Sequence, residues 1–150
     1  MSRLKSLSGV LAAVSLVVCA AGVQAREMVS VDRAVVNMRS GSSTQHSVLW
    51  ALSKGYPLEV TRHQGNWLQV RDFENDQGWV YRPMVGKKAH VIVKSRVVNV
   101  RSAPSTSSRV LGKAEYGEVL RTLENKSQWV KVQRDGGTKG WVSRGLVWGW

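Results

Sequence analysis

The hexapeptides Val35-Val36-Asn37-Met38-Arg39-Ser40 and Val97-Val98-Asn99-Val100-Arg101-Ser102 are two copies of one pattern, 62 residues apart. The same spacing holds far beyond them without a gap, and it pairs Gly55 with Gly117, Trp67 with Trp129, Gly78-Trp79-Val80 with Gly140-Trp141-Val142, and Val85 with Val147. A fixed internal period indicates a repeated structural unit. The sequence therefore predicts two small domains, at residues 26–86 and 91–150, joined by a linker short enough for the domains to touch.

Each unit is predicted to be all-β. In the first unit, apolar or alternating stretches lie at 27–36, 48–52, 58–60, 67–71 and 78–81, with turn-forming residues between them and a break near Asp32-Arg33. No window keeps the 3.6-residue period of an amphipathic helix. About five short strands at this spacing are typical of a small antiparallel barrel or sandwich.

Residues 1–25 have the features of a secretory signal peptide. Arg3 and Lys5 precede an apolar run at 10–21, and small residues stand before a cut after Ala25. The run is too short for a comfortable transmembrane helix, so we expect no such helix in the mature chain. Retention as an anchor and lipidation at Cys19 are the alternatives. The leader predicts a periplasmic or secreted bacterial protein.

The chain is strongly basic, with 22 Lys and Arg against 10 Asp and Glu, and the charge is unevenly distributed. Residues 26–86 carry 7 basic and 6 acidic side chains, whereas residues 87–150 carry 13 basic and 4 acidic ones. This asymmetry indicates an anionic partner for the second unit, with a merely soluble cationic surface as the alternative. Nucleic acid would fit the charge but not the compartment, and is not expected.

No pattern in the sequence predicts a catalytic centre. Cys19, the only cysteine, falls in the leader, so the mature chain would lack a thiol nucleophile. His46, His63 and His90 stand apart without the spacing of metal ligands. The few acidic residues give no pair suited to glycoside cleavage. We therefore expect that the protein is not an enzyme and has no catalytic residues, no metal site and no cofactor.

One series of motifs occurs in both units: Asn-x-Arg-Ser, a small-residue loop, Val-Leu, Gly, Trp-x-x-Val and Gly-Trp-Val. This series resembles the bacterial SH3 (SH3b) domain family over nearly the whole chain after the leader. The resemblance implies two tandem SH3-like β-barrels that act as non-catalytic binding modules, many of which hold cell-wall hydrolases on peptidoglycan while others bind proteins. Met84 and Leu146 stand where eukaryotic SH3 domains have a groove tyrosine, so a proline-rich peptide ligand is not expected.

Residues that match between the units are expected to serve the fold. Arg39 and Arg101 are predicted to hydrogen-bond loop carbonyls, and Gly55 and Gly117 are predicted to occupy turns with positive φ. Four matched aromatic residues are expected in the core or on a groove floor more often than against a ligand: Trp67, Trp79, Trp129 and Trp141.

Positions that differ between the units have the better claim to function, because a residue needed by the fold should occur in both copies. Trp50, Tyr56 and Tyr81 of the first unit face Gly112, Glu118 and Ser143 of the second. The end of the chain adds Trp148 and Trp150, for which packing against a barrel is the alternative role. The predicted ligand-binding residues are Trp50, Tyr56, Tyr81, Trp79, Trp141, Trp148, Trp150, Arg109, Lys113 and Lys131.

Together these features predict a secreted or periplasmic binding module for peptidoglycan or another component of the cell envelope. The basic second unit would add attraction to an anionic envelope surface. The alternative is a protein–protein adaptor in the periplasm with no affinity for the cell wall.

Overall fold

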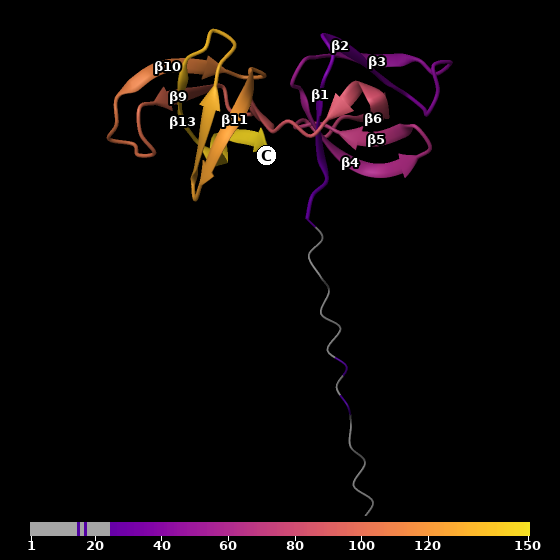
Figure 1. Ribbon diagram of the computed structural model, residues 1–150, viewed down its shortest axis with the longest axis horizontal. Coiled ribbons are helices and arrows are strands. Elements are labelled where there is room, and N and C mark those ends of the chain that lie inside the picture. Colours follow the sequence, from indigo (N-terminus) through magenta and orange to yellow (C-terminus); the bar gives the residue numbers. More distant parts are fainter. Residues whose placement is uncertain (1–14, 16, 18–24) are drawn as a thin grey trace, which may run out of the picture.

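The computed structural model describes residues 15, 17 and 25–150, so the predicted signal peptide lies almost entirely outside the described residues. The described chain forms two all-β barrels that lie side by side, each built on one seven-stranded sheet (Figure 1). All strand pairs in both sheets are antiparallel. The predicted fold class, two tandem SH3-like barrels, is confirmed.

The elements of the two barrels follow each other in the same order. The first barrel contains β1 (Met28–Val31), β2 (Val35–Arg39), β3 (Val48–Ser53), β4 (Pro57–Gln64), β5 (Trp67–Arg71), β6 (Gln77–Tyr81), the 3-10 helix η1 (Arg82–Met84) and β7 (Val85–Gly86). The second contains β8 (His90–Val93), β9 (Val97–Arg101), β10 (Val110–Glu115), β11 (Val119–Lys126), β12 (Trp129–Gln133), β13 (Lys139–Ser143), η2 (Arg144–Leu146) and β14 (Val147–Gly149).

The strand orders are also equivalent, β3-β2-β6-β5-β4-β1-β7 and β10-β9-β13-β12-β11-β8-β14. The break expected near Asp32-Arg33 separates β1 from β2. The sequence reading missed η1 and η2, together with the short strands β7 and β14 that follow them. These pieces are only two or three residues long, too short to show any periodicity.

Each barrel has an aliphatic core. The first core includes Val36, Met38, Leu58, Leu68, Val70 and Val80, and the second includes the equivalent residues Val98, Val100, Leu120, Val130, Val132 and Val142. Neither core cluster contains a tryptophan. The alternation of side chains along a strand explains why tryptophan is absent from the core clusters. In β5, Leu68 and Val70 point into the barrel, whereas the neighbouring Trp67 points to the other face. The four matched tryptophans were expected in the core or on a groove floor; Trp67, Trp79 and Trp129 are half-buried outside the core clusters, and Trp141 is buried.

The repeated arginine secures the loop that follows the hexapeptide. The Arg39 guanidinium donates hydrogen bonds to the carbonyl oxygens of Thr44 and His46, at 3.1 and 2.9 Å. Arg101 makes the equivalent bonds to Thr106 and Ser108, at 2.9 and 3.0 Å. This confirms that the arginine of the hexapeptide serves the scaffold of both barrels.

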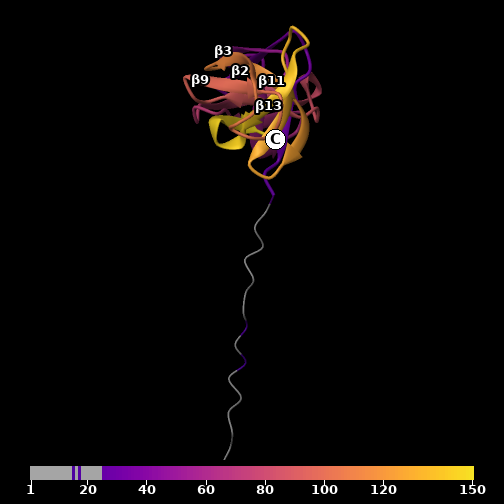
Figure 2. The same cartoon turned by 90° about the vertical axis from the view of Figure 1, so that its left-hand side faces the viewer.

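The two barrels touch, as the short linker predicts. The Arg26 guanidinium of the first barrel lies over the Trp148 ring of the second, 4.9 Å from its centroid. The rings of Phe73 and Tyr116 make a second contact, with centroids 5.4 Å apart. Figure 2 looks along the line that joins the barrels, and the second barrel there covers the first. The chain ends between the two barrels (Figure 1).

Candidate functional site

A groove with a cavity volume of about 490 Å³ opens on the first barrel. Its aromatic and apolar side is formed by Trp67 at the start of β5, Tyr81 at the end of β6 and Met84 in η1. Val35, Val36 and Asn37 of β2 also line the groove, and Arg39, Ser43 and Thr44 add polar groups. The groove therefore combines an aromatic wall with a polar rim.

Sheet register brings the two aromatic rings together. Trp67 and Tyr81 are partners across the β5–β6 pair, and both side chains point away from the core. Their ring centroids are 5.4 Å apart with planes tilted by 48°, a favourable geometry for an aromatic pair. Tyr81 remains 37% exposed, and both rings line the groove.

The loop after β2 supplies polar residues of the groove, and two hydrogen bonds from Arg39 brace this loop. Ser43 and Thr44 belong to that loop, and the Thr44 carbonyl accepts from Arg39. The Ser43 hydroxyl lies 2.8 Å from Nδ1 of His46 in the same loop. The polar groups of the groove are thus preorganised, which lowers the entropic cost of binding.

The second barrel does not reproduce the aromatic pair. Trp129 has Ser143 as its partner across β12–β13, where the first barrel has Tyr81. Leu146 stands in the place of Met84 and is 38% exposed. The equivalent surface therefore has one aromatic ring in place of two.

Of the predicted ligand-binding residues, the groove contains Tyr81. Trp50 lies elsewhere, on β3 at the edge of the sheet, and is 53% exposed. Tyr56 is half-buried, and its hydroxyl donates to the carboxylate of Asp72 at 3.1 Å. Burial, with the Asp72 charge next in importance, raises the pKa of Tyr56. The other Asp72 oxygen accepts from the backbone of Glu74 and Asp76, so Tyr56 supports a turn.

The other predicted aromatic residues lie in different parts of the molecule. Trp79 lies beside the Arg62 guanidinium at 6.0 Å, and Trp141 lies beside the Lys131 ammonium at 5.9 Å. Trp148 is covered by Arg26 of the first barrel. The Trp150 backbone N–H donates to the His90 carbonyl at 3.1 Å, which folds the end of the chain against its own barrel. Arg109 and Lys113 are exposed on the second barrel.

The groove also contains Trp67, Met84 and Asn37, which are not among the ligand-binding residues predicted from the sequence. Trp67 was expected in the core or on a groove floor, and Asn37 was expected to serve the fold, because both residues match between the copies. Two positions in the sequence indicated the groove. Met84 occupies the place of the SH3 groove tyrosine, and Trp67 begins a strand directly after a turn. A residue that matches between the copies can therefore line a groove as well as belong to the scaffold.

Two further searches of residues 15, 17 and 25–150 give negative findings. Among these residues, no three His, Cys, Asp or Glu side chains are grouped so as to hold a metal ion. Within the same residues, no helix has the length and apolar character needed to cross a membrane.

A curated protein of Bacillus subtilis (strain 168), "Putative N-acetylmuramoyl-L-alanine amidase YrvJ", is 26% identical over 123 residues. The alignment covers 75% of this chain but only 24% of the relative, so the chain spans about a quarter of that protein's length. The prediction that the chain is not an enzyme is contradicted by this comparison, because the relative carries the name of an enzyme.

Solved structures with similar arrangements include NlpC2 from Trichomonas vaginalis, at 11% identity, with 83% of this chain and 48% of that chain covered and a TM-score of 0.38. Another is an NlpC/P60 family protein from Bacillus cereus ATCC 10987, at 14% identity, with 83% and 56% covered and a TM-score of 0.35. Scores this low carry no inference about function.

Two family profiles, both described as bacterial SH3 domain, match the chain in tandem. One covers residues 32–86 and the other covers residues 96–147. Each match lies on one of the two barrels and includes that barrel's copy of the Asn-x-Arg-Ser motif. The chain belongs to the bacterial SH3 domain family and carries two consecutive copies of the domain.

Proposed function

We propose that the two domains bind peptidoglycan of the bacterial cell wall through the groove of the first barrel, in the periplasm or outside the cell. The observation that carries this proposal is the Trp67–Tyr81 pair, which lines one groove together with polar residues of the loop that Arg39 braces. The family and the name of the curated relative, a cell-wall amidase, support the same polymer as the ligand. The predicted leader at residues 1–25 supports the location.

The chemistry of the groove suits this polymer. Peptidoglycan offers sugar rings and peptide groups, and both stack on the face of an aromatic ring. The polar rim supplies the amide of Asn37 and the hydroxyls of Ser43 and Thr44, which can hydrogen-bond sugar hydroxyl, acetamido or peptide groups. A few polar groups placed around an apolar wall are the usual composition of a small-ligand site.

A sedimentation assay on purified peptidoglycan tests the proposal. Trp67→Ala should reduce retention about tenfold or more, as expected for an aromatic residue at the centre of a binding site. Trp129→Ala is the matched control, because it removes the equivalent ring from the barrel that lacks the aromatic pair. Equal retention of the wild type and Trp67→Ala would remove the groove from the function. If both variants lost retention on peptidoglycan to the same extent, binding would not depend on the Trp67–Tyr81 pair.

The name of the curated relative also links this binding to amidase chemistry. The same purified wall should therefore be assayed for release of soluble fragments by the full chain. Cross-linking in intact cells covers the remaining partner class: a single dominant envelope protein, captured without wall fragments, would favour an adaptor over a wall-binding protein.

A further inference from the structure

The outer face of strands β11, β12 and β13 on the second barrel is basic. Sheet register aligns its side chains in three rows across the three strands, because residues directly opposite each other on antiparallel strands share a face. The rows are Lys126, Trp129 and Ser143; Glu124, Lys131 and Trp141; and Arg121, Gln133 and Lys139. They alternate along the strands with the core residues Val130, Val132 and Val142, so they lie on the side away from the core. We call these nine residues the β11–β13 face.

The first barrel has the equivalent face on β4, β5 and β6, but with different charges. Its rows are Gln64, Trp67 and Tyr81; Arg62, Gln69 and Trp79; and Glu59, Arg71 and Gln77. Four positions that are Glu or Gln there become Arg or Lys on the second barrel, namely Glu59 to Arg121, Gln64 to Lys126, Gln69 to Lys131 and Gln77 to Lys139. Two arginines change in the other direction, to Glu124 and Gln133. Two cations and one glutamate are thus replaced by four cations and one glutamate.

The two faces also differ in how their charges are paired. On the first barrel Arg71 forms an ion pair of 2.6 Å with Glu59, so these two charges offset each other. None of the four cations of the β11–β13 face has an ion pair among the residues that the structure describes. The Lys131 ammonium lies 5.9 Å from the centre of the Trp141 ring, in the middle row of the face. The positive charge of this face is therefore available to a partner.

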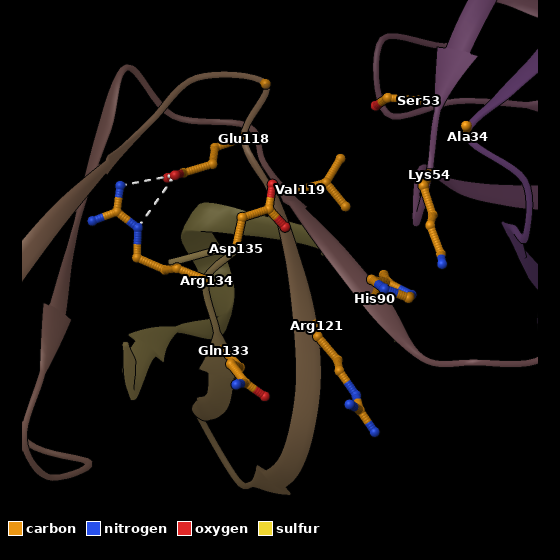
Figure 3. Close-up of a pocket in the computed structure, with 11 residues that line it drawn as sticks. Ala34, Ser53, Lys54, His90, Glu118, Val119, Arg121, Gln133, Arg134 and Asp135 are labelled. Atoms are coloured by element: carbon orange, nitrogen blue, oxygen red, sulfur yellow. Dashed lines mark hydrogen bonds and ion pairs between the residues drawn. The ribbon is translucent and has the colours of Figure 1, made fainter. Parts of the chain in front are cut away.

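One edge of the β11–β13 face borders a cleft of about 870 Å³ between the barrels. Figure 3 shows Arg121 on the second-barrel side of this cleft and Lys54 on the first-barrel side. Lys126, Lys131 and Lys139 are not part of the lining of the cleft. Lys126 and Lys139 are exposed, and Lys131 is half-buried. A partner can therefore meet these three lysines without entering the space between the barrels.

The spacing of the four cations fits an extended anionic surface. Neighbouring strands lie about 4.8 Å apart and alternate residues of one strand about 7 Å apart, so the cations are spread over roughly 10 by 14 Å. A single phosphate or carboxylate cannot contact all of them at this spacing. An anionic phospholipid bilayer offers many phosphate groups side by side, and its surface potential attracts Lys and Arg that come within a Debye length.

The apolar residues at one end of the face favour a bilayer over a soluble polyanion. Trp129 is half-buried and is the register partner of Lys126. Leu146, which is 38% exposed, is the equivalent of Met84, and Met84 lies with Trp67 in the groove of the first barrel. Tryptophan is enriched where membrane meets water, and lysine stems can cover apolar surface while their ammonium groups reach the headgroups.

We propose that the β11–β13 face of the second barrel binds the anionic surface of a phospholipid bilayer. The face and the aromatic groove lie on different barrels, so this proposal does not depend on the ligand of the groove. It gives the excess positive charge of the second unit a partner. Of the cations that the sequence predicted to bind a ligand, Lys131 lies on this face, whereas Arg109 and Lys113 lie outside it.

Co-sedimentation with lipid vesicles tests the proposal on residues 26–150, which contain both complete barrels and exclude the apolar leader. Vesicles of phosphatidylcholine with roughly one-third phosphatidylglycerol should bind the protein, and vesicles of phosphatidylcholine alone should not. Combining Lys126→Gln, Lys131→Gln and Lys139→Gln should weaken binding about 100-fold, since each basic residue near an anionic bilayer contributes about fivefold. This variant should fold normally, because the first barrel has glutamine at all three equivalent positions.

A variant with the same net charge separates the face from the overall charge of the protein. It combines Lys94→Gln, Arg96→Gln and Lys113→Gln, three exposed cations of the second barrel outside the β11–β13 face. Its vesicle affinity should stay within about threefold of the wild type, because salt screens charges that lie more than about 10 Å from the bilayer.

A transfer variant asks whether the pattern is sufficient. It places Gln64→Lys, Gln69→Lys and Gln77→Lys on the first barrel of the triple-glutamine variant, and so rebuilds the three lysines on the equivalent face. Vesicle binding should return to within about tenfold of the wild type. The restored binding should again require phosphatidylglycerol.

Three results would overturn the proposal. The first is equal vesicle binding by the wild type and the triple-glutamine variant. The second is an equal loss in the variant with the same net charge, which would show attraction by total charge alone. The third is binding to dextran sulfate with no binding to vesicles, which would indicate a soluble polyanion as the partner. Wall retention is assayed separately, and the triple-glutamine variant should keep the retention that depends on Trp67.

Discussion

Trp67 and Trp129 begin equivalent strands in two barrels of the same strand order, yet only Trp67 has an aromatic partner. The difference comes from one position, Tyr81 in the first barrel and Ser143 in the second. The cores, the braced loops and the positive-φ turns are the same in both. The comparison shows that duplication preserved the scaffold while the surface at the groove and the net charge diverged.

The largest expected effects break the shared scaffold. Leu58→Ala and Leu120→Ala remove fully buried equivalent side chains, and each should lower the free energy of unfolding of its own barrel by about 2–5 kcal/mol. Chemical denaturation followed by tryptophan fluorescence measures both. Only Leu58→Ala should also abolish wall retention through the groove. Equal loss of retention in Leu120→Ala would show that the second barrel is part of the primary site.

An exchange at the divergent position sharpens the comparison of the grooves. Tyr81→Ser gives the first barrel the residue of the second and should lower peptidoglycan affinity about tenfold, while Ser143→Tyr should raise the contribution of the second barrel. Tyr81 is exposed and Ser143 is half-buried at the last position of its strand, so stability should change little. Affinity on purified peptidoglycan is the measurement. No change in either variant would mean that the aromatic pair does not bind the ligand.

The glycine pair separates backbone strain from contact between the barrels. Gly55 and Gly117 have φ of +84° and +80°, so an alanine at either position costs roughly 1–2 kcal/mol of strain. A Cβ at Gly117 meets nothing within 4 Å, but one at Gly55 meets His90 and Val119. Gly55→Ala should therefore be the more destabilising and should also loosen the barrel contact, seen as faster hydrogen exchange around His90. Equal effects would show that the turn does not hold the barrels together.

The smallest expected effect is a pH dependence confined to the second barrel. Burial, aided by the charges of Lys88 and Arg121, lowers the pKa of His90 below its ordinary value of 6.5, although a bond to the Lys88 carbonyl and the charge of Asp135 oppose the shift. A histidine whose pKa is lower in the folded state binds protons more readily when unfolded. Stability is therefore full above pH 6.5 and decreases as the pH falls through that value toward the lower pKa of the folded state.

Unfolding measured between about pH 7 and pH 5.5 checks this direction. The first barrel has Met28 at the equivalent position, so His90→Met is the matched control and should remove the dependence. A wild-type stability that rises on acidification over this range would contradict the assigned shift of the pKa.

Most of the fold could be predicted from the sequence, because the repeat doubled every local signal. The strand over 67–71 was predicted with its observed bounds, and the break between β1 and β2 was expected near Asp32-Arg33. The candidate site was predicted less well. Tyr81 was identified because the copies differ there, but Trp67 was expected in the core or on a groove floor, and not as a ligand contact, because they agree. Burial of a residue in a strand depends on which face it occupies, and that face is decided by the valines beside it.

The sequence alone was enough for two barrels with aliphatic cores, since periodicity and turn residues are local properties that repeat after 62 positions. Tertiary structure decided which side chains meet. Sheet register placed Tyr81 beside Trp67. A hydrogen bond from the Tyr56 hydroxyl to Asp72 holds Tyr56 in a half-buried position. Docking of the barrels brought Lys54 and Arg121 to the lining of one cleft, although these residues belong to different repeats. Contacts between distant residues depend on register and domain packing, and no local pattern in the chain records them.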